Sequence, residues 1–418
     1  MGEFRIKGGR RLCGEVAVPG SKNAVLPILA ATVLGKKSII HNCPKISDRD
    51  NTIEILLRLG CDVAIDGRTI IVDAGGIKSH ELPEEETAKM RSSIIFAGGL
   101  LGRFGKFTAY HPGGCKLGER PIDLHLEAFC DLGAILEDDR KMIVAKAKKL
   151  SGTKINLPLP SVGATQNAML AATLADGITV IENAAKEPEI IYLQDYLISA
   201  GAKVMGAGSC TIVIEGVTQL HDAEYTISPD RIVAGTYLAA GAITGGTVRL
   251  KHVVHEDIDP IVQKLADMGA VITRDGRAIN LSAPNRLHSL DYLATGSHPG
   301  FPTDMQPQLT ALLATARGAS LVNETVFEAR YKHIEGLVAM GAEIVNHENK
   351  IFQIEGVNHL HGNTVAATDL RCGAALVLAG LAAKGETIVK DAVHIERGYE
   401  AIHEDLQALG ADITLHPA

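Results

Sequence analysis

The sequence contains no tryptophan, and aromatic residues make up only 4% of its 418 residues. Proteins that bind nucleic acid usually carry a basic face, and those that bind single strands stack bases on aromatic side chains. This chain has 41 Lys and Arg against 49 Asp and Glu, a formal net charge of −8. A nucleic-acid function is therefore disfavoured, and any anion site must be a local group of basic residues in an acidic protein.

Long apolar runs and paired cysteines are also missing. The most apolar stretch, AALVLAGLAA at 374–383, is typical of a buried helix and too short to span a membrane. The N-terminal segment MGEFRIKGGRRLCG lacks the apolar stretch of a signal peptide. The seven cysteines are scattered without a CxxC pair, which favours a reducing compartment and argues against a zinc site. We expect a cytoplasmic protein without membrane insertion, metal or cofactor.

One pattern recurs six times along the chain. A helix-ending phrase, such as LRLGCDV or ISAGAKV, places glycines at 60, 133, 201, 269, 341 and 410, which are 68 to 73 residues apart. In the fourth copy, residues 230–244 have helical apolar spacing and 247–253 alternate as a strand. A second helix ends at Gly269, and a hairpin turns at Asp275-Gly276. Six copies in register indicate repeats of one α/β unit that must pack on its neighbours.

The two ends of the chain complement each other. The last copy stops one strand early, at ADITLHPA, and the chain begins with a spare strand, EFRIKGG. We expect the N-terminal strand to complete the sixth unit. Three units per domain then predict one domain at 21–228 and a second made of 1–20 plus 229–418, with two crossings near Gly20 and Pro229.

The segment GGCKLGERP, residues 113–121, carries a cysteine among cations. Lys116 and Arg120 lie within five residues of Cys115, and glycines stand on both sides. A thiol near cations has a lowered pKa, which suits a proton donor or a nucleophile. His111 and His125 lack an obvious orienting partner, so papain-like acyl transfer is disfavoured. The alternative is an inert loop cysteine, but a lid that delivers a group on closure is favoured.

Other polar residues lie at strand-to-helix junctions of the repeat. Lys22 and Asn23 open a helix after a Pro-Gly turn, and Ser161 and Gly163 precede another helix. Such positions either bind an anion or, as the alternative, only cap the helix and leave the lysine in solvent. Asp304 lies on a proline-flanked segment with few nearby charges, where a carboxylate either caps a helix or serves as a general base. Each arginine alone is an ordinary surface charge, but convergent arginines indicate a ligand with several negative oxygens. The candidates are Arg91, Arg330, Arg371 beside Asp369, and Arg397.

These segments together resemble the enolpyruvyl transferase family, in the branch that accepts UDP-N-acetylglucosamine. The resemblance runs over almost the whole chain, through PGSKNA, PGGC..GERPIDLH, SVGAT, FPTDMQ, TVFEARY, TDLR and HIERGYE. It implies an inside-out α/β barrel of two domains, each with three βαβαββ units, in agreement with the repeat count. One departure is Ala329 in FEAR, where the family has Asn.

The resemblance also implies a reaction and its partners. The 3′-hydroxyl of UDP-N-acetylglucosamine adds to C2 of phosphoenolpyruvate, C3 is protonated, and phosphate leaves to give an enol ether. This is the first committed step of peptidoglycan precursor synthesis, and it requires no metal or redox cofactor. A monomer is compatible with the sequence.

The resemblance carries roles onto residues by motif. The expected catalytic residues are Cys115, Asp304, Lys22 and Arg397. Cys115 would protonate C3, trap the pyruvyl unit covalently and react with the epoxide fosfomycin, and Asp304 would deprotonate the sugar hydroxyl. Lys22 and Arg120 would bind phosphate, Asn23 the intermediate, and Arg330, Arg371 and Arg397 the carboxylate. The nucleotide sugar would contact Arg91, Arg120, Pro121, Ile122, Asp123, Leu124, Pro160, Ser161, Val162, Gly163 and Val326.

Two alternatives remain open at this point. The shikimate-pathway enolpyruvyl transferase has the same fold and donor, but would show GSKS and lack the cysteine segment. A noncatalytic binding or regulatory paralogue would keep the fold, but Lys22, Cys115, Asp304 and Arg397 are all intact.

Overall fold

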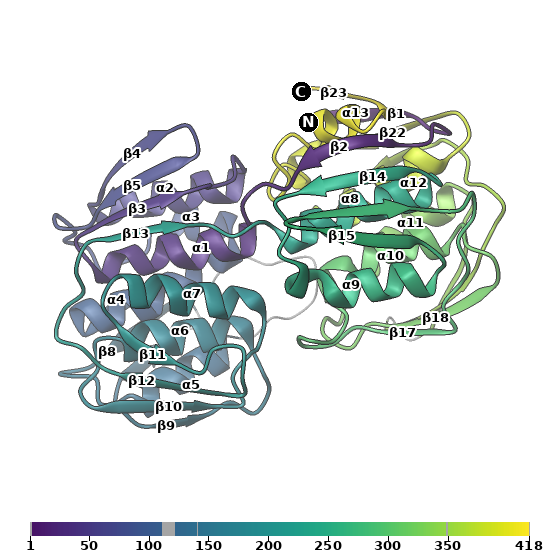
Figure 1. The fold of residues 1–418 in the computed structure, drawn as a ribbon. Helices are drawn as coiled ribbons and strands as arrows, with labels where there is room; N and C mark the ends of the chain where they lie inside the picture. The colour runs from purple at the N-terminus through teal and green to yellow at the C-terminus, as the bar shows by residue number, and fades with distance from the viewer. Residues whose placement is uncertain (1, 111–121, 140, 348–349, 418) are drawn as a thin grey trace. The chain divides into compact units, whose positions relative to one another are not determined.

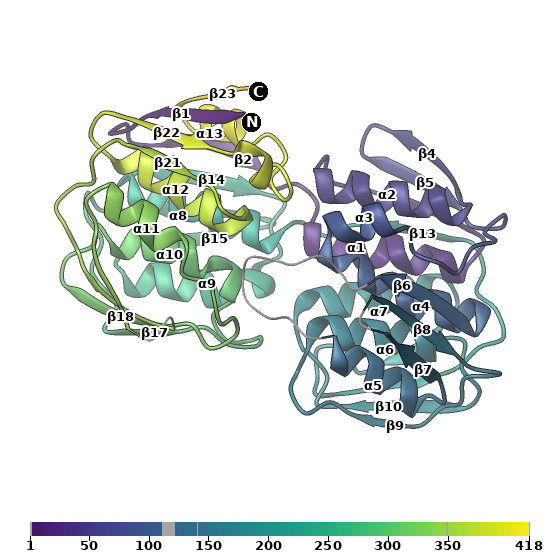
Figure 2. The same ribbon diagram turned by 180° about the vertical axis from the view of Figure 1, so that it is seen from behind.

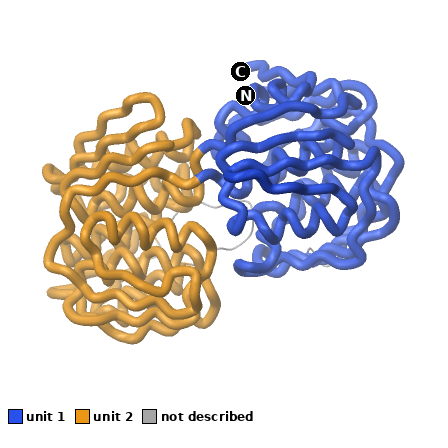
Figure 3. The backbone as a smooth tube through the Cα atoms, in the orientation of Figure 1, with its two compact units in different colours: residues 1–19, 116–118, 229–418 blue, residues 20–115, 119–228 orange. Residues whose placement is uncertain are grey.

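The computed structural model describes residues 2–110, 122–139, 141–347 and 350–417. Within these residues the chain forms two compact units (Figure 3), which we number as in the figure. Unit 1 contains residues 2–19 and 229–417, and unit 2 contains residues 20–110 and 122–228. The chain crosses between them twice, from Pro19 to Gly20 and from Ser228 to Pro229. No helix in these ranges is both long and apolar enough to cross a membrane.

The described strands of unit 2 form three sheets, with the orders β13-β3-β5-β4, β6-β8-β7 and β11-β12-β10-β9. The strands are β3 (Lys37–His41), β4 (Asp62–Asp66), β5 (Thr69–Asp73), β6 (Lys106–Tyr110), β7 (Ile135–Asp138), β8 (Met142–Lys146), β9 (Lys154–Asn156), β10 (Ile178–Glu182), β11 (Lys203–Met205), β12 (Thr211–Glu215) and β13 (Ala223–Thr226). The helices are α1 (Lys22–Ala31), η1 (Thr32–Leu34), α2 (Ser47–Leu59), α3 (Glu84–Lys89), η2 (Arg91–Ile95), α4 (Phe96–Phe104), α5 (Asp123–Asp131), α6 (Val162–Ala172) and α7 (Pro188–Ser199).

Unit 1 repeats the arrangement, and its described strands form the sheets β15-β16-β14-β2, β17-β18-β20-β19 and β21-β22-β1-β23. The strands are β1 (Glu3–Lys7), β2 (Cys13–Ala17), β14 (Thr247–Lys251), β15 (Val271–Asp275), β16 (Ala278–Ser282), β17 (Tyr292–Ala294), β18 (Ala319–Asn323), β19 (Glu343–His347), β20 (Ile351–Glu355), β21 (Thr364–Ala366), β22 (Glu386–Lys390) and β23 (Asp412–His416). The helices are α8 (Arg231–Ile243), α9 (His255–Asp267), η3 (Thr303–Met305), α10 (Gln306–Leu313), α11 (His333–Ala339), α12 (Leu370–Ala382), η4 (Ala392–His394) and α13 (Ile402–Ala408).

In each unit the sheets lie outside and a set of helices lies inside (Figures 1 and 2). Every residue of α8 and α10 is buried, and these helices pack on α12, which is buried almost throughout. Because α8 and α12 are apolar on almost every side, they must lie in an interior. In unit 2, α1, α4 and α6 hold the same place. This is the inside-out α/β barrel that the resemblance implied.

Glycines mark the repeat in the backbone. The six helix-ending glycines at 60, 133, 201, 269, 341 and 410 all have φ between +94° and +100°. Only glycine adopts this left-handed conformation without strain, so each one ends its helix and starts the following strand. The predicted turn glycines Gly67 and Gly276 also have positive φ, at 60° and 56°. The phase of the repeat predicted from the sequence is confirmed.

The two crossings exchange strands between repeats. Elsewhere a short strand before an inner helix pairs in parallel with the strand after it, as in β9 with β10 and β21 with β22. By contrast, β2 precedes α1 of unit 2 but pairs with β14 of unit 1. Conversely, β13 precedes α8 of unit 1 but pairs with β3 of unit 2. Each crossing strand therefore belongs to a sheet of the unit that the chain is leaving.

The N-terminal strand completes the sixth repeat, as predicted. β1 lies between β22 and β23 and pairs antiparallel with both, with Ile6 opposite Thr387 and Ile413. It takes the place that the second hairpin strand holds in other sheets, such as β5 between β3 and β4. The first residues of the chain thus close a sheet made by its last residues.

Ile6→Ala should therefore destabilise unit 1 by about 2–5 kcal/mol, the usual cost of emptying a filled core position. Ile6 is fully buried and packs on Gly380 of α12. Denaturant unfolding would measure the loss, and hydrogen exchange should rise in β22 and β23. Ile65→Ala is the control, because Ile65 on β4 is 52% exposed. Equal stability of the two variants would contradict a closing role for β1.

Candidate active site

Three of the predicted residues meet in unit 1. Asp304 lies on η3, Arg330 lies in the turn before α11, and Arg371 lies in the first turn of α12. Arg330 Nη1 donates to Asp304 Oδ1 at 2.9 Å, and Arg371 Nη2 donates to Oδ2 at 2.8 Å. Each carboxylate oxygen thus receives one guanidinium group. Few charges stand near Asp304 in the sequence, because the two arginines that meet it in the fold are 26 and 67 residues away along the chain.

Burial and charge act in opposite directions on Asp304. Burial opposes its ionisation, but the charges and hydrogen bonds of Arg371 and Arg330 outweigh burial and hold the pKa of Asp304 well below its usual range. The Arg330 and Arg371 side chains are 6% and 5% exposed, whereas the Asp304 side chain is 24% exposed. Asp304 is therefore the accessible member of the cluster, and in this arrangement its carboxylate is a weak base.

Both guanidinium groups are also held by neighbours other than Asp304. The Arg330 Cζ atom lies 4.4 Å from the ring centroid of Phe327, a cation–π contact. Arg371 Nη1 lies 3.4 Å from the hydroxyl of Tyr399, which lies 2.8 Å from Thr236 Oγ1. In arginines fixed in this way the N–H donors of the guanidinium groups are already oriented, which favours the binding of a carboxylate.

The first residue of α11, His333, lies in the same region and was missed by the sequence analysis. It is fully buried, and its ring packs edge-on against Phe352. Burial and the charge of Arg330 lower the pKa of His333 to about 3. His333 is therefore neutral at neutral pH, and it lies near the arginine without adding a charge. Its only sequence signal is its position three residues after Arg330.

In unit 2, Lys22 is paired with a buried carboxylate. Its Nζ atom lies 2.8 Å from Oδ2 of Asp48, in the first turn of α2, and the two side chains are 13% and 6% exposed. Ser21 caps α1 by accepting from the N–H of Ala24 at 3.3 Å. The ammonium therefore has a fixed position at the helix start. Asp48 was not predicted, because an acidic residue early in a helix is common for electrostatic reasons alone.

A second buried side chain links the segments expected to contact the nucleotide sugar. Asn167 of α6 donates to the carbonyl of Ile94 in η2 at 3.1 Å and accepts from the N–H of Gly98 at 2.7 Å. Its Nδ2 also lies 2.7 Å from Nδ1 of His125 on α5. A Cβ added to Gly163 would lie only 2.8 Å from the His125 ring, so α5 and α6 approach closely there. The expectation that His125 lacks an orienting partner was wrong.

Asn167 therefore brings three predicted segments together. They are η2 with Arg91, the start of α5 with Ile122 to Leu124, and the start of α6 with Ser161 to Gly163. Gly163 lies inside the first turn of α6 rather than before it, and Ser161 caps the helix. This role was not predicted from the sequence, because an Asn in a helix is like any other polar residue until its neighbours in the fold are known.

The remaining predicted residues are more scattered. Asp369 caps α12 by accepting from the N–H groups of Arg371 and Cys372. Val326 is 45% exposed, Arg397 lies half-buried in the turn after η4, and Asn23 and Pro160 are half-buried. His111, Cys115, Lys116, Arg120 and Pro121 lie outside the described residues.

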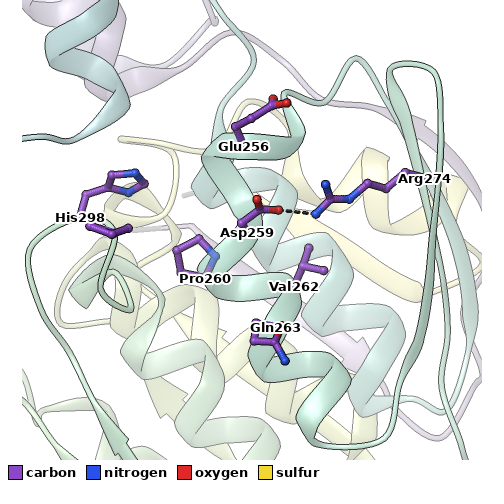
Figure 4. Close-up of a pocket in the computed structure, with 8 residues that line it drawn as sticks. Glu256, Asp259, Pro260, Val262, Gln263, Arg274 and His298 are labelled. Carbon is purple, nitrogen blue, oxygen red and sulfur yellow. Dashed lines mark hydrogen bonds and ion pairs between the residues drawn. The ribbon is translucent and has the colours of Figure 1, made fainter. Parts of the chain in front are cut away.

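A hollow of about 440 Å³ lies beside α9 in unit 1 (Figure 4). Asp259 and Arg274 form an ion pair at its wall. Its lining contains none of the predicted site residues, and consists of Glu256, Asp259, Pro260, Val262, Gln263, Arg274, His298 and Pro299. Nowhere in the described ranges do three or more His, Cys, Asp or Glu side chains group as they would to hold a metal ion.

Known proteins match this chain over nearly its whole length. Residues 6–406 match the family described as EPSP synthase (3-phosphoshikimate 1-carboxyvinyltransferase). The chain is 51% identical over 415 residues to UDP-N-acetylglucosamine 1-carboxyvinyltransferase 2 of Caldanaerobacter subterraneus subsp. tengcongensis, covering 99% of both chains. It is 47% identical to UDP-N-acetylglucosamine 1-carboxyvinyltransferase 1 of Staphylococcus aureus strain N315, again over 99% of both.

A solved structure agrees with these relatives. The enolpyruvyl transferase NikO from Streptomyces tendae superimposes with a TM-score of 0.89 at 27% identity, over 100% of this chain and 99% of that one. An EPSP synthase from Acinetobacter baumannii has a TM-score of 0.75 at 18% identity over 100% of both chains, which supports the fold alone.

The buried His333 predicts how stability depends on pH. The unfolded chain binds a proton at this residue below its ordinary pKa of 6.5, whereas the folded chain does so only near 3. Stability should therefore fall as pH is lowered between these values, by up to about 1.4 kcal/mol per pH unit from this group. His333→Leu should flatten that part of the profile, measured by denaturant unfolding from about pH 4.5 to 6.5. His347→Leu, at an exposed position, should not. Identical slopes in all three proteins would contradict the prediction.

Proposed function

This chain belongs to the EPSP synthase family of enolpyruvyl transferases, and we propose that it transfers the enolpyruvyl group of phosphoenolpyruvate to the 3′-hydroxyl of UDP-N-acetylglucosamine. Phosphate is released, in the cytoplasm, at the first committed step of peptidoglycan precursor synthesis. Two relatives that carry this activity in their names align over 99% of the chain. The structural observation that carries the proposal is the pair of buried arginines that meet on Asp304, because such a pair suits an incoming carboxylate.

The proposed substrate contacts follow the expected motifs. Lys22 and Arg120 bind the phosphate of phosphoenolpyruvate, while Arg330, Arg371 and Arg397 bind its carboxylate. The segments joined by Asn167 contact the nucleotide sugar, together with Val326. The two compact units are proposed to be the two domains, 21–228 and 1–20 plus 229–418.

Asp304 is the proposed base, and its arginines determine when it can act. While both guanidinium groups bind it, its low pKa makes it a poor proton acceptor. A substrate carboxylate on Arg330 and Arg371 competes with Asp304 for the same donors. Asp304 then loses part of its stabilisation, its pKa rises, and it becomes a better base for the sugar hydroxyl. The base is thus activated only when the donor substrate is bound.

The proton balance assigns the second role to Cys115. In the addition step, the sugar hydroxyl gives its proton to Asp304 while its oxygen bonds to C2, and Cys115 supplies a proton to C3. In the elimination step, C3 loses a proton and the bond from C2 to the phosphate oxygen breaks. A thiol can donate and take back this proton if its pKa is near neutral, as nearby cations would make it.

A phosphate-release assay tests the proposed function. The purified protein is given phosphoenolpyruvate with either UDP-N-acetylglucosamine or shikimate 3-phosphate. Phosphate release with the nucleotide sugar alone supports the proposal. Release with shikimate 3-phosphate alone would identify the other branch of the family, and no release with either acceptor would favour a noncatalytic paralogue.

Asp304→Ala separates catalysis from binding of the nucleotide sugar. Turnover should fall by a factor of about 10² to 10⁴, the usual contribution of a positioned acid or base. The affinity for UDP-N-acetylglucosamine, measured by calorimetry, should change little. Near-normal turnover would remove Asp304 from the proposed role.

Fosfomycin should form a single covalent adduct, on Cys115. Its phosphonate would bind in the phosphate site and hold the epoxide carbon next to the sulfur, which makes alkylation a local reaction. Burial raises the pKa of Cys43 to about 12 and those of Cys61 and Cys372 to about 11, so these thiols are weak nucleophiles at neutral pH. Tryptic mapping by mass spectrometry would locate the adduct.

Two substitutions serve as controls for this prediction. Cys115→Asp should retain some turnover and resist fosfomycin, because a carboxyl group donates protons but alkylates poorly. Cys115→Ser should lose most turnover, because a hydroxyl is too weak an acid. An adduct on another cysteine, or full activity after complete labelling of Cys115, would contradict the assignment.

A further inference from the structure

A fully buried glutamate stands directly before the loop that carries Arg330. Glu324 follows β18 and has no exposed surface. Its Oε1 accepts from the N–H groups of Val326 and Phe327, at 2.9 and 3.0 Å, and from the Thr295 hydroxyl at 3.0 Å. Its Oε2 accepts from the Thr303 hydroxyl at 2.9 Å. A carboxylate so far from water needs such a set of donors, and these donors come from the end of β17, from η3 and from the loop after β18.

The direction of these hydrogen bonds follows from the chemistry of the groups. A carboxylate only accepts, so the hydroxyl protons of both threonines point at Glu324. Each threonine oxygen is then left to accept from another donor. Thr295 Oγ1 accepts from the N–H of Thr325 at 2.9 Å, and Thr303 Oγ1 accepts from Arg330 Nη1 at 2.8 Å. A directed chain therefore runs from Arg330 through Thr303 to Glu324.

The same nitrogen of Arg330 serves both Thr303 and Asp304. Nη1 carries two hydrogens, and it donates to Thr303 Oγ1 at 2.8 Å and to Asp304 Oδ1 at 2.9 Å. The Nε atom of Arg330 is buried without a hydrogen-bond partner among the described residues. The angle at which the guanidinium meets Asp304 thus depends strongly on Thr303. Glu324 also binds the N–H of Phe327, whose ring stacks on the guanidinium.

We propose that Glu324 is a positioning residue that holds Arg330 on Asp304 through the Thr303 hydroxyl and the Phe327 backbone. It does not contact Asp304 or Arg330 through any hydrogen bond seen among the described residues, so it acts through its two neighbours. The inference rests on the proposed function for its meaning in catalysis. The contact between Arg330 and Asp304 can be tested without turnover.

Glu324→Gln tests the proposal because it preserves the shape of the side chain but replaces one of the two acceptor oxygens with a donor nitrogen. If the new amide nitrogen faces Thr303, it donates a hydrogen bond to the threonine oxygen. The threonine hydroxyl can then no longer donate to residue 324, and its proton must point to the side where Arg330 donates. If the amide is flipped, its nitrogen faces the two N–H groups and the hydroxyl that meet at Oε1. The first orientation reverses the bond between Thr303 and residue 324, and the second sets donors against donors, so neither preserves the directed chain from Arg330 through Thr303 to residue 324.

Thr303→Val removes the same link from the other side and leaves the three bonds to Oε1 in place. We expect both variants to lower kcat by about 10- to 100-fold, the scale of a displaced catalytic group. The more basic Asp304 does not compensate, because a displaced Arg330 no longer holds the substrate carboxylate in position. The KM for UDP-N-acetylglucosamine should change by less than about threefold, because the lost interaction acts on the reacting centre. The double variant should be no slower than the slower single variant. Thr303→Ser, which keeps the hydroxyl, should restore activity to within about twofold of the parent protein.

The titration of Asp304 distinguishes positioning from a general effect on folding. If Arg330 no longer holds Asp304, the pKa of Asp304 should rise toward its ordinary value, and the acid limb of the kcat/KM profile should move to higher pH. Carbon-13 NMR of the aspartate carboxyl groups follows this shift without substrates, with Asp304→Asn to assign the signal. Glu328→Gln is the matched control, because Glu328 is an exposed glutamate of the same loop, and the Asp304 titration should not move.

The outcomes separate this inference from the proposed function. An unchanged Asp304 titration in Thr303→Val, or additive losses of kcat in the double variant, would overturn it. If Glu324→Gln does not fold, Thr303→Val decides by the same two measurements. If the protein shows no turnover with either acceptor, the proposed function fails, while the NMR titration still decides whether Glu324 and Thr303 hold Arg330 on Asp304.

Discussion

Both units depend on the burial of mainly apolar inner helices that have almost no exposed face. Such helices have no polar face that could lie against water, so in each unit sheets surround them. Small residues on the inner helices let neighbouring helices approach closely. Gly98 is one such position, because a Cβ there would overlap the backbone oxygen of Asn167. The hydrophobic effect thus explains why the repeat places helices inside and sheets outside, the reverse of the usual α/β barrel.

Because of this burial, a polar group near the inner helices lowers the stability of the fold unless it has hydrogen-bond partners. Asn167 meets this requirement by bonding to η2, α4 and α5 at once. Glu324 meets it with four donors from the ends of β17 and β18 and from η3. In both cases the pairing partners are the backbones and side chains next to predicted substrate contacts. The polar groups that the core must satisfy therefore also set the geometry of the segments proposed to bind substrate.

The cluster of Asp304, Arg330 and Arg371 shows how charge and burial combine. Burial alone would raise the pKa of Asp304, and the two arginines reverse that effect. A carboxylate ligand offers the arginines the same chemistry that Asp304 offers. In the proposed mechanism, binding of the donor substrate and activation of the base are therefore linked, because the substrate carboxylate and Asp304 compete for the same two guanidinium groups.

The sequence by itself determined the repeat, its phase and the closing of the sixth unit by the N-terminal strand, because glycine at a helix end and alternation in a strand are local requirements. It also identified Asp304, Arg330 and Arg371 as candidates. Only the tertiary structure decided that they meet, that β2 and β13 are exchanged at the crossings, and that Asp48, His125, Asn167, His333 and Glu324 support the candidate site. All of these features depend on contacts between residues far apart in the chain. A local sequence pattern does not predict a buried hydrogen bond whose partner lies in another part of the chain.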